Sequence, residues 1–243
     1  MQQHSTTPRS PLALYLSLPI LSWAFYDFAN TIFSSNINTI FFPFYTDDVI
    51  GTSVARQQVA STFVSYANAV ASFFLVMFSP LFGVWIDRTG YKKRFIVWFA
   101  SISILATFMM GVFGGIQSDA LMWGVPLSYA LVVISFVIAK FFFNSSLVFY
   151  DSMMSDLGTK QEMPLISGFG VAVGYVGTIV GLLVYLLVSE GEFHKAFIPT
   201  AILYLLFSLP LFFINKDTPI PKEQRKKADS LTAIKKSFKR LKI

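Results

Sequence analysis

Six long apolar runs, separated by short polar connections, constrain this chain more than any other feature of its sequence. A transmembrane helix needs roughly 17–25 mostly apolar residues, and each run reaches that length. The runs are continuous, whereas barrel strands alternate apolar and polar residues over short segments, so we expect helices. The expected spans are Leu18–Tyr45, Val59–Ile86, Phe95–Ile116, Met122–Phe149, Leu165–Val188 and Ala196–Ile214.

The composition indicates that lipid surrounds most of this surface. Hydrophobic residues make up 54% of the chain and charged residues 13%, where a soluble domain has about 25% charged residues. Cysteine is absent, and the two histidines, His4 and His194, lie outside the apolar runs. We therefore expect no cofactor, no metal site and no disulfide framework.

The distribution of lysine and arginine predicts the orientation of the spans. With the N-terminus inside, sixteen of the 19 cationic residues are cytoplasmic, Arg56 and Lys195 are outside, and Lys140 lies within a span. Cytoplasmic loops carry this excess of positive charge, so we expect both termini to be cytoplasmic, in a plasma or inner membrane. This placement accounts for the net charge of +6, so we expect membrane lipids as partners and no nucleic acid.

The chain is expected to divide into three parts: a cytoplasmic N-terminal segment at 1–17, a six-helix transmembrane bundle at 18–215, and a basic tail or linker at 216–243. The first part has neither a cationic start nor a small-residue cleavage site, so we expect no cleaved signal peptide. The tail fits a short helix on an anionic membrane surface and fits a solvated linker equally well. The apolar residues on one face of that helix are Leu231, Ile234, Phe238 and Leu241.

The connection between the second and third runs, Gly83–Arg94, reads GVWIDRTGYKKR. A plain anchor at an anionic leaflet would need the cations only. Gly83 allows two helices to approach closely, Asp87 suits a facing helix N-terminus, and Gly90 permits a tight turn. The residues of the motif are Gly83, Asp87, Arg88, Gly90, Lys92, Lys93 and Arg94.

This motif resembles the loop between helices 2 and 3 of the major facilitator superfamily, and it occurs at the equivalent place in the chain. The resemblance implies an all-α integral membrane fold, in which six helices form one half as an inverted repeat of three plus three helices. It also implies that the loop is a conformational latch between two six-helix halves, which stabilises one state of alternating access.

A narrower resemblance is to the Atg22-like (UMF1) permease group. Ser22–Asn30, reading SWAFYDFAN, is similar to the signature that opens the first helix of that group. Residues 148–154 and 166–170 are similar to its fourth-helix end and fifth-helix start. Two departures are the six spans, where the group has about twelve, and Asp151 and Ser155, where the group usually has Asn and Pro. The resemblance implies a permease for a small solute, with amino acids as a candidate substrate, and not an enzyme.

The first expected span carries a polar stripe. Asp27 lies about 13 Å into the run at 1.5 Å per residue, and Asn30, Ser34 and Asn38 follow on the same helical face. A carboxylate at this depth needs a partner or a water-filled cavity. Hydrogen bonding between helices would equally explain the amides and Ser34. We assign Asp27, Asn30 and Ser34 to a substrate or proton cavity, with Asp27 as a possible route for proton coupling.

The fourth expected span contributes Lys140 and, one turn further on the same face, Asn144 to this cavity. Lys140 lies about 15 Å from the cytoplasmic end of its run, so it is expected at the depth of Asp27. A pair of Asp27 and Lys140 would bind a zwitterion or move a proton. A static ion pair that fixes packing is the open alternative.

The fifth expected span carries a row of glycines on one face. No strand precedes them and no acidic residue follows at the required distance, so a dinucleotide site is not expected. Their spacing predicts a seam of close helix packing. The glycines of this seam are Gly170, Gly174, Gly177 and Gly181.

Six helices would expose the face that packs on the other half of a facilitator. We therefore expect a partner, which is a missing C-terminal half, a second chain or a second copy of this chain. A membrane-embedded enzyme would need clustered carboxylates, and Asp151 and Asp156 do not share a helical face. A non-transporting six-helix scaffold or assembly protein is the remaining alternative.

Overall fold

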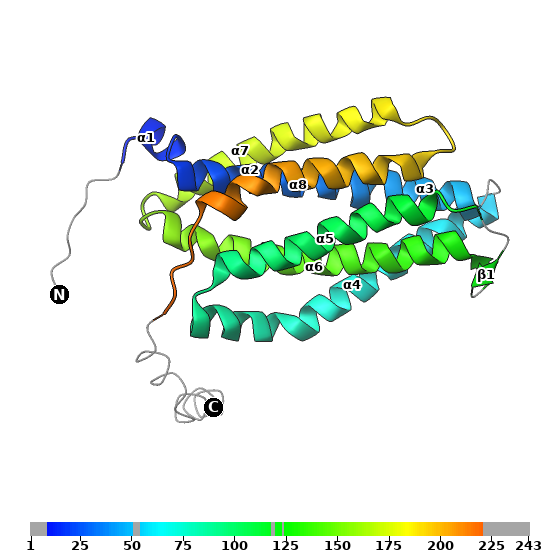
Figure 1. Cartoon of the computed structure of the whole chain (residues 1–243), viewed down its shortest axis with the longest axis horizontal. Helices are drawn as coiled ribbons and strands as arrows, with labels where there is room; N and C mark the ends of the chain where they lie inside the picture. The colour runs from blue at the N-terminus through cyan, green and yellow to red at the C-terminus, as the bar shows by residue number, and fades with distance from the viewer. Residues whose placement is uncertain (1–8, 51–53, 118–119, 123, 221–243) are drawn as a thin grey trace, which may run out of the picture.

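The computed structural model describes residues 9–50, 54–117, 120–122 and 124–220. Long helices lie side by side along one axis (Figure 1). The first half contains α1 (Pro11–Tyr15), α2 (Leu18–Phe33), the π-helical segment η1 (Ser34–Phe41), α3 (Phe42–Ile50), α4 (Val54–Thr89) and α5 (Lys92–Gly114). The second half contains the hairpin of β1 (Leu121–Met122) and β2 (Val125–Pro126), then α6 (Leu127–Leu157), α7 (Met163–Leu182), the 3-10 segments η2 (Leu183–Leu187) and η3 (Phe193–Ala196), and α8 (Phe197–Ile214).

Five helices among the described residues are long and apolar enough to cross a membrane. The first expected span is helical throughout, but it is divided into α2, η1 and α3, which follow one another without a gap. The wider π turn brings the Thr39 hydroxyl to the carbonyl oxygen of Ser34, five residues earlier, to which it donates at 3.2 Å. The number of six spans stays a prediction. The five helices are Val59–Thr89, Lys92–Gly114, Leu127–Leu157, Met163–Leu187 and Phe193–Ile214.

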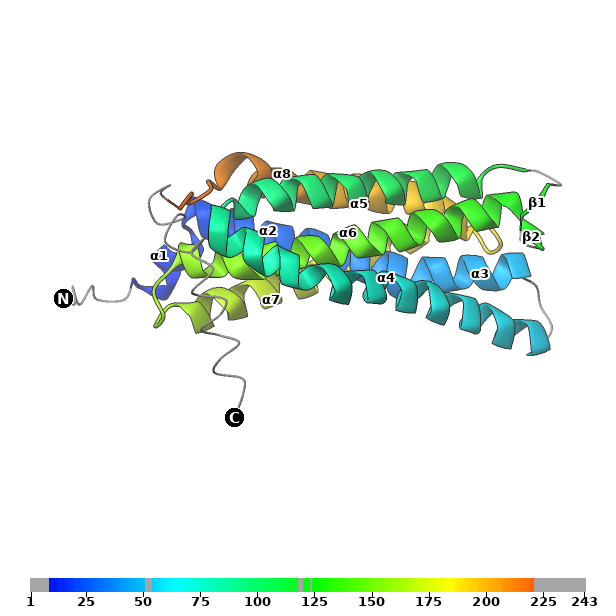
Figure 2. The same ribbon diagram turned by 90° about the horizontal axis from the view of Figure 1, so that it is seen from below.

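The helices pair in a symmetric pattern. Helix α2 packs against α7 and α8, whereas α6 packs against α4 and α5. If α2, α4 and α5 are exchanged in order with α6, α7 and α8, the pairs that α2 makes become the pairs that α6 makes. Figure 2 shows α4 crossing the bundle at an angle and reaching α3, with which it is in contact at the far end.

Aromatic rings fill the interface between these two groups of helices. Phe33 of α2 stacks on Phe143 of α6 with ring centroids 4.4 Å apart, and Phe42 of α3 stacks on Phe136 at 3.8 Å. The rings of Phe33, Phe42 and Phe136 are fully buried. Such pairs contribute about 0.5–1.5 kcal/mol each beyond their buried area, so they fix the rotation of α2 and α3 relative to α6.

The fourth expected span is displaced at both ends. Leu121–Met122 and Val125–Pro126 pair as the two strands of the hairpin, and Gly124, before β2, has a φ of +80°, so the helix begins at Leu127 and not at Met122. At the other end α6 continues past Phe149 to Leu157, because no Gly or Pro interrupts its polar last turns before Gly158. The expected bounds were drawn from apolar residues only, and they missed these turns.

The turn between α4 and α5 requires glycine at position 90. Gly90 has a φ of +67°, a conformation that costs other residues energy. A Cβ there would also lie 2.3 Å from the carbonyl oxygen of Thr218. Gly83 differs, because a Cβ at that position would meet no atom within 4 Å. The close helix approach expected at Gly83 is therefore absent among the described residues, since no described element packs there.

Candidate functional site

The glycine row of α7 lies against α2. A Cβ at Gly177 would lie 2.5 Å from the carbonyl oxygen of Phe28, and one at Gly170 would lie 2.5 Å from the Trp23 ring. The Thr31 hydroxyl donates to the carbonyl oxygen of Gly174 at 2.7 Å. Gly181 completes the row beside the Asn36 amide, which donates to its carbonyl oxygen at 2.9 Å. The backbone of α7 therefore forms one wall beside the polar face of α2.

Asp27 lies half-buried at this wall, in the middle of α2. One carboxylate oxygen faces Gly174, where an added Cβ would be 3.0 Å away. No donor among the described residues bonds to the carboxylate, and its electrostatic neighbour is a second acid, Asp151. A carboxylate within a membrane helix is costly without a partner, so Asp27 is the most costly group in this region.

Asn30 lies one turn above Asp27 and is 3% exposed. Neither its amide nitrogen nor its amide oxygen has a hydrogen-bond partner among the described residues. Ser34 and Asn38 follow in the π-helical segment, both half-buried, and the buried amide oxygen of Asn38 also lacks a partner there. A buried polar atom without a partner costs about 1–3 kcal/mol. A hydrogen-bond partner from outside the described residues would remove this cost.

Lys140 is not paired with Asp27. Its ammonium donates to the side-chain oxygen of Asn68 on α4 and lies 6.0 Å from the centre of the Phe136 ring. Asn144, half-buried, follows one turn later. The expected ion pair was wrong because α6 runs on to Leu157. Lys140 therefore lies about 25 Å from the C-terminal end of its helix at 1.5 Å per residue, much further than Asp27 from the start of α2.

Tyr150 and Asp151 occupy the place beside Asp27 that was expected for Lys140. The Tyr150 ring stacks on Trp23 with centroids 4.5 Å apart, and Trp23 Nε1 donates to the Tyr150 carbonyl oxygen at 3.2 Å. The Tyr150 hydroxyl is buried without a partner among the described residues and interacts electrostatically with both acids. One signal in the sequence would have found these residues, since the tripeptide Phe-Tyr-Asp occurs at 25–27 and again at 149–151.

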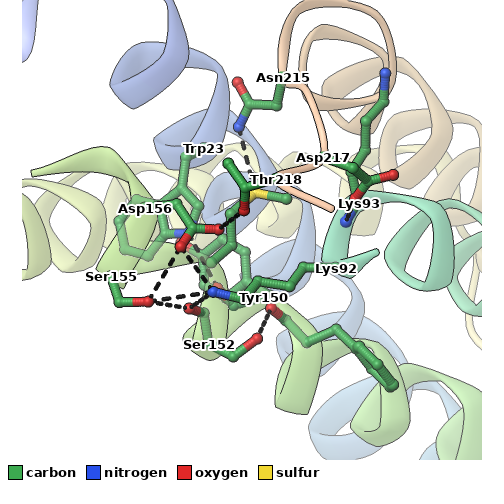
Figure 3. A network of polar contacts seen from close by, with 12 residues as sticks. Trp23, Lys92, Lys93, Tyr150, Ser152, Ser155, Asp156, Asn215, Asp217 and Thr218 are labelled. Atoms are coloured by element: carbon green, nitrogen blue, oxygen red, sulfur yellow. Dashed lines mark hydrogen bonds and ion pairs between the residues drawn. The ribbon is translucent and has the colours of Figure 1, made fainter. Parts of the chain in front are cut away.

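A second polar cluster lies at the end of the bundle that carries the turn between α4 and α5 (Figure 3). We call this end the inner end, after the orientation expected from the sequence, and the cluster the inner network. Lys92, at the start of α5, donates to Asp156 Oδ1 at 2.8 Å, to the Ser152 carbonyl oxygen at 2.9 Å and to Ser155 Oγ at 3.2 Å. The Thr218 hydroxyl donates to the other Asp156 oxygen at 2.9 Å. The network therefore joins α5, the end of α6 and the segment that follows α8.

The other residues of the loop motif lie around the inner network. The backbone N–H of Lys93 donates to Asp217 Oδ1 at 2.7 Å, and the N–H of Ile220 donates to the Thr89 carbonyl oxygen at 3.2 Å. The remaining charged residues of the motif, Asp87, Arg88 and Arg94, are exposed. The segment after α8 is therefore held along the loop.

A clamp on the same end joins residues far apart in the chain. Arg9 donates from Nε and from its backbone N–H to Glu162 Oε1, at 2.9 and 3.0 Å, and from a second guanidinium nitrogen to Oε2 at 3.1 Å. Thr159 donates to Glu162 Oε2 as well. These bonds hold the pKa of Glu162 well below its ordinary value, with the bond from the Arg9 side chain as the largest cause.

Two helices expose apolar side chains along much of their length. In its most apolar stretch α4 has 11% of its residues buried, against 44% for α5. The α7 face opposite its glycines is exposed as well. In the part of the chain that the structure describes, no group of His, Asp and Glu residues is suited to hold a metal. The large exposed side chains on these faces include Phe63, Tyr66, Phe73, Trp85, Val171, Tyr175 and Ile179.

Comparisons with known proteins agree with this architecture. The family model described as Major Facilitator Superfamily matches residues 12–243. The chain is 25% identical over 233 residues to the uncharacterized MFS-type transporter YxiO of Bacillus subtilis (strain 168), which covers 90% of this chain and 52% of that protein. It is 26% identical over 191 residues to an uncharacterized protein of Aquifex aeolicus (strain VF5), and this match covers 78% of this chain and 43% of that protein. The chain thus spans about half the length of these relatives, and no solved structure matches it.

Proposed function

This chain belongs to the Major Facilitator Superfamily, and we propose that it forms one half of a permease that moves a small solute across a membrane by alternating access. One observation carries this proposal. Asp27, Asn30 and the Tyr150 hydroxyl lie inside an apolar bundle without partners among the described residues. Groups of this kind in a membrane helix mark a solute or proton pathway, and an enclosed structural bundle would have paired them.

A second six-helix half completes the proposed permease. The exposed apolar faces of α4 and α7 flank the helices that carry the polar groups, so a partner on those faces would close a central cavity. The half-length match to the relatives and the symmetric pairing of the helices support an inverted repeat of three plus three helices. The partner is a C-terminal half, a second chain or a second copy of this chain.

The inner network fits the role of the conformational latch. Lys92 ties the loop motif to the end of α6, and Gly90 fits the loop against Thr218. Contacts at this end would have to break when the cavity opens inward. Residues 216–220 would then be the start of a linker between the halves. Amino acids of the kind moved by Atg22-like permeases remain the candidate substrates, and Asp27 the candidate for proton coupling.

Counterflow in proteoliposomes tests the proposal. The chain, purified with whatever second half it has in its source membrane, is reconstituted and loaded with a mixture of amino acids, and entry of each labelled amino acid is followed with and without a pH gradient. We expect entry that Asp27→Asn abolishes and Asp48→Asn, at the opposite end of the same helical run, leaves intact. A complete assembly without entry of any solute would favour the scaffold alternative.

A further inference from the structure

We propose that the polar face of α2, beside Asp151 of α6, takes a primary ammonium group of its solute between the carboxylates of Asp27 and Asp151. This inference deepens the proposed function. It rests on that function for the statement that the bound amine is transported, whereas binding of the amine does not depend on it. It replaces the expectation of a zwitterion held between Asp27 and Lys140, because the structure places Lys140 elsewhere.

The charge of the site favours a cation. Asp27 and Asp151 are electrostatic neighbours, and two acids in one site repel each other unless a cation or a proton lies between them. Lys140 is bonded to Asn68 and lies eleven residues, or about 16 Å along α6, from Asp151. Asp27 is half-buried and Asp151 is exposed, so an entering solute can reach both.

Two buried groups without partners lie beside the acids. The Tyr150 hydroxyl, on a side chain 3% exposed, interacts electrostatically with both carboxylates. The amide of Asn30, also 3% exposed, lies one turn along the face of Asp27. The Tyr150 ring is held in place by its stack on Trp23. Buried polar atoms without partners beside two acids are groups that a bound ligand would satisfy.

The atoms present select the kind of cation. The two carboxylates are acceptors only, and the Tyr150 hydroxyl and the Asn30 amide can accept as well as donate, whereas a primary ammonium carries three N–H donors and no acceptor. A quaternary ammonium would satisfy the charge and leave the acceptors unbonded. The solute's carboxylate, if it has one, would find no cation here among the described residues. A cationic amine therefore fits better than an anion.

Binding of matched probes tests this site. The probes are n-butylamine, tetramethylammonium, butyrate and leucine, titrated by calorimetry against the purified protein with its second half in lipid nanodiscs. We expect n-butylamine to bind more tightly than the other three. Since a hydrogen bond to a charged group is worth about 1.5–3 kcal/mol, Asp27→Asn and Asp151→Asn should each weaken n-butylamine about tenfold to a hundredfold. Asp48→Asn is the control and should change nothing.

Other results overturn the inference. Equal binding of n-butylamine by the wild type and by Asp151→Asn, preference for butyrate or leucine, or no binding of any probe each removes the proposed site. Tyr150→Phe keeps the ring and its stack on Trp23, so it guards against misfolding, and it should weaken n-butylamine severalfold. Counterflow of a neutral or anionic solute in the same preparation would leave the proposed function standing without this inference. Binding of n-butylamine without counterflow of any solute would support the binding site and contradict the proposed function.

Discussion

The two polar clusters of this molecule differ in how completely they are bonded. At the inner end, Glu162 accepts bonds from Arg9 and Thr159, and Asp156 accepts bonds from Lys92 and Thr218. Beside α2, Asp27, Asn30 and the Tyr150 hydroxyl have no donor or acceptor among the described residues. Both clusters combine acids with neutral polar side chains, so composition does not distinguish them.

This difference separates structural groups from groups held ready for a ligand. A saturated cluster stabilises the fold, and its loss costs free energy of unfolding. A cluster without partners costs free energy while it is empty, so removing its polar atoms should stabilise the protein and abolish its function. Removal of polar atoms should therefore change the free energy of unfolding in opposite directions at the two clusters.

The clamp of Arg9 on Glu162 should give the largest effect. Glu162 is buried and accepts from two residues, so Glu162→Gln should lower the thermal midpoint of unfolding more than any substitution below. The pKa of this carboxyl is depressed in the folded protein. Its contribution is therefore complete above the ordinary pKa of 4.5 and is lost as the pH falls below it, because the unfolded chain then binds the extra proton.

Thermal unfolding in detergent, followed from pH 7 down to pH 3, measures this contribution. The midpoint of the wild type should fall towards that of Glu162→Gln below about pH 4.5. A constant difference between the two proteins over the whole range would mean that the carboxylate charge does not hold the clamp.

Lys92→Met should destabilise the protein by about 2–3 kcal/mol, because the change removes charge-assisted bonds from the inner network. Lys92 and Asp156 have side chains 11% and 26% exposed, so water replaces these bonds only in part. Lys93→Met is the matched control, since the bond to Asp217 comes from the backbone of Lys93. Equal unfolding midpoints for the two variants would show that the network does not stabilise the fold.

Asn30→Leu should stabilise the protein, whereas Lys92→Met should destabilise it. The change removes two buried polar atoms without partners, so we expect a gain of about 1 kcal/mol in the free energy of unfolding together with loss of solute entry. Asn36→Leu is the control, because the Asn36 amide donates to Gly181 and Thr200 and its loss should destabilise. A destabilised Asn30→Leu protein would place Asn30 among the structural groups.

The sequence predicted the fold better than the site, for a physical reason. Apolar runs locate helices because lipid demands continuous hydrophobic surface, and five of the expected runs are membrane-length helices. The partners of Lys140 and Asp27 depend on how far each helix extends and how it is rotated. The polar last turns of α6 are invisible to hydropathy, so Lys140 was placed at the wrong depth. The bond from Arg9 to Glu162, 153 residues apart, had no local signal.

Tyr150→Phe gives the smallest and most discriminating effect on stability. The substitution removes one oxygen and keeps the ring stacked on Trp23. An empty site predicts no loss of stability, and a gain of up to about 0.5 kcal/mol, because a buried hydroxyl without a partner is removed. A structural hydroxyl would cost about 1 kcal/mol when lost. Tyr26→Phe is the internal standard, because the Tyr26 hydroxyl donates to Ser146 at 2.9 Å. If both tyrosine variants unfold at the same temperature below the wild type, the two clusters do not differ in kind.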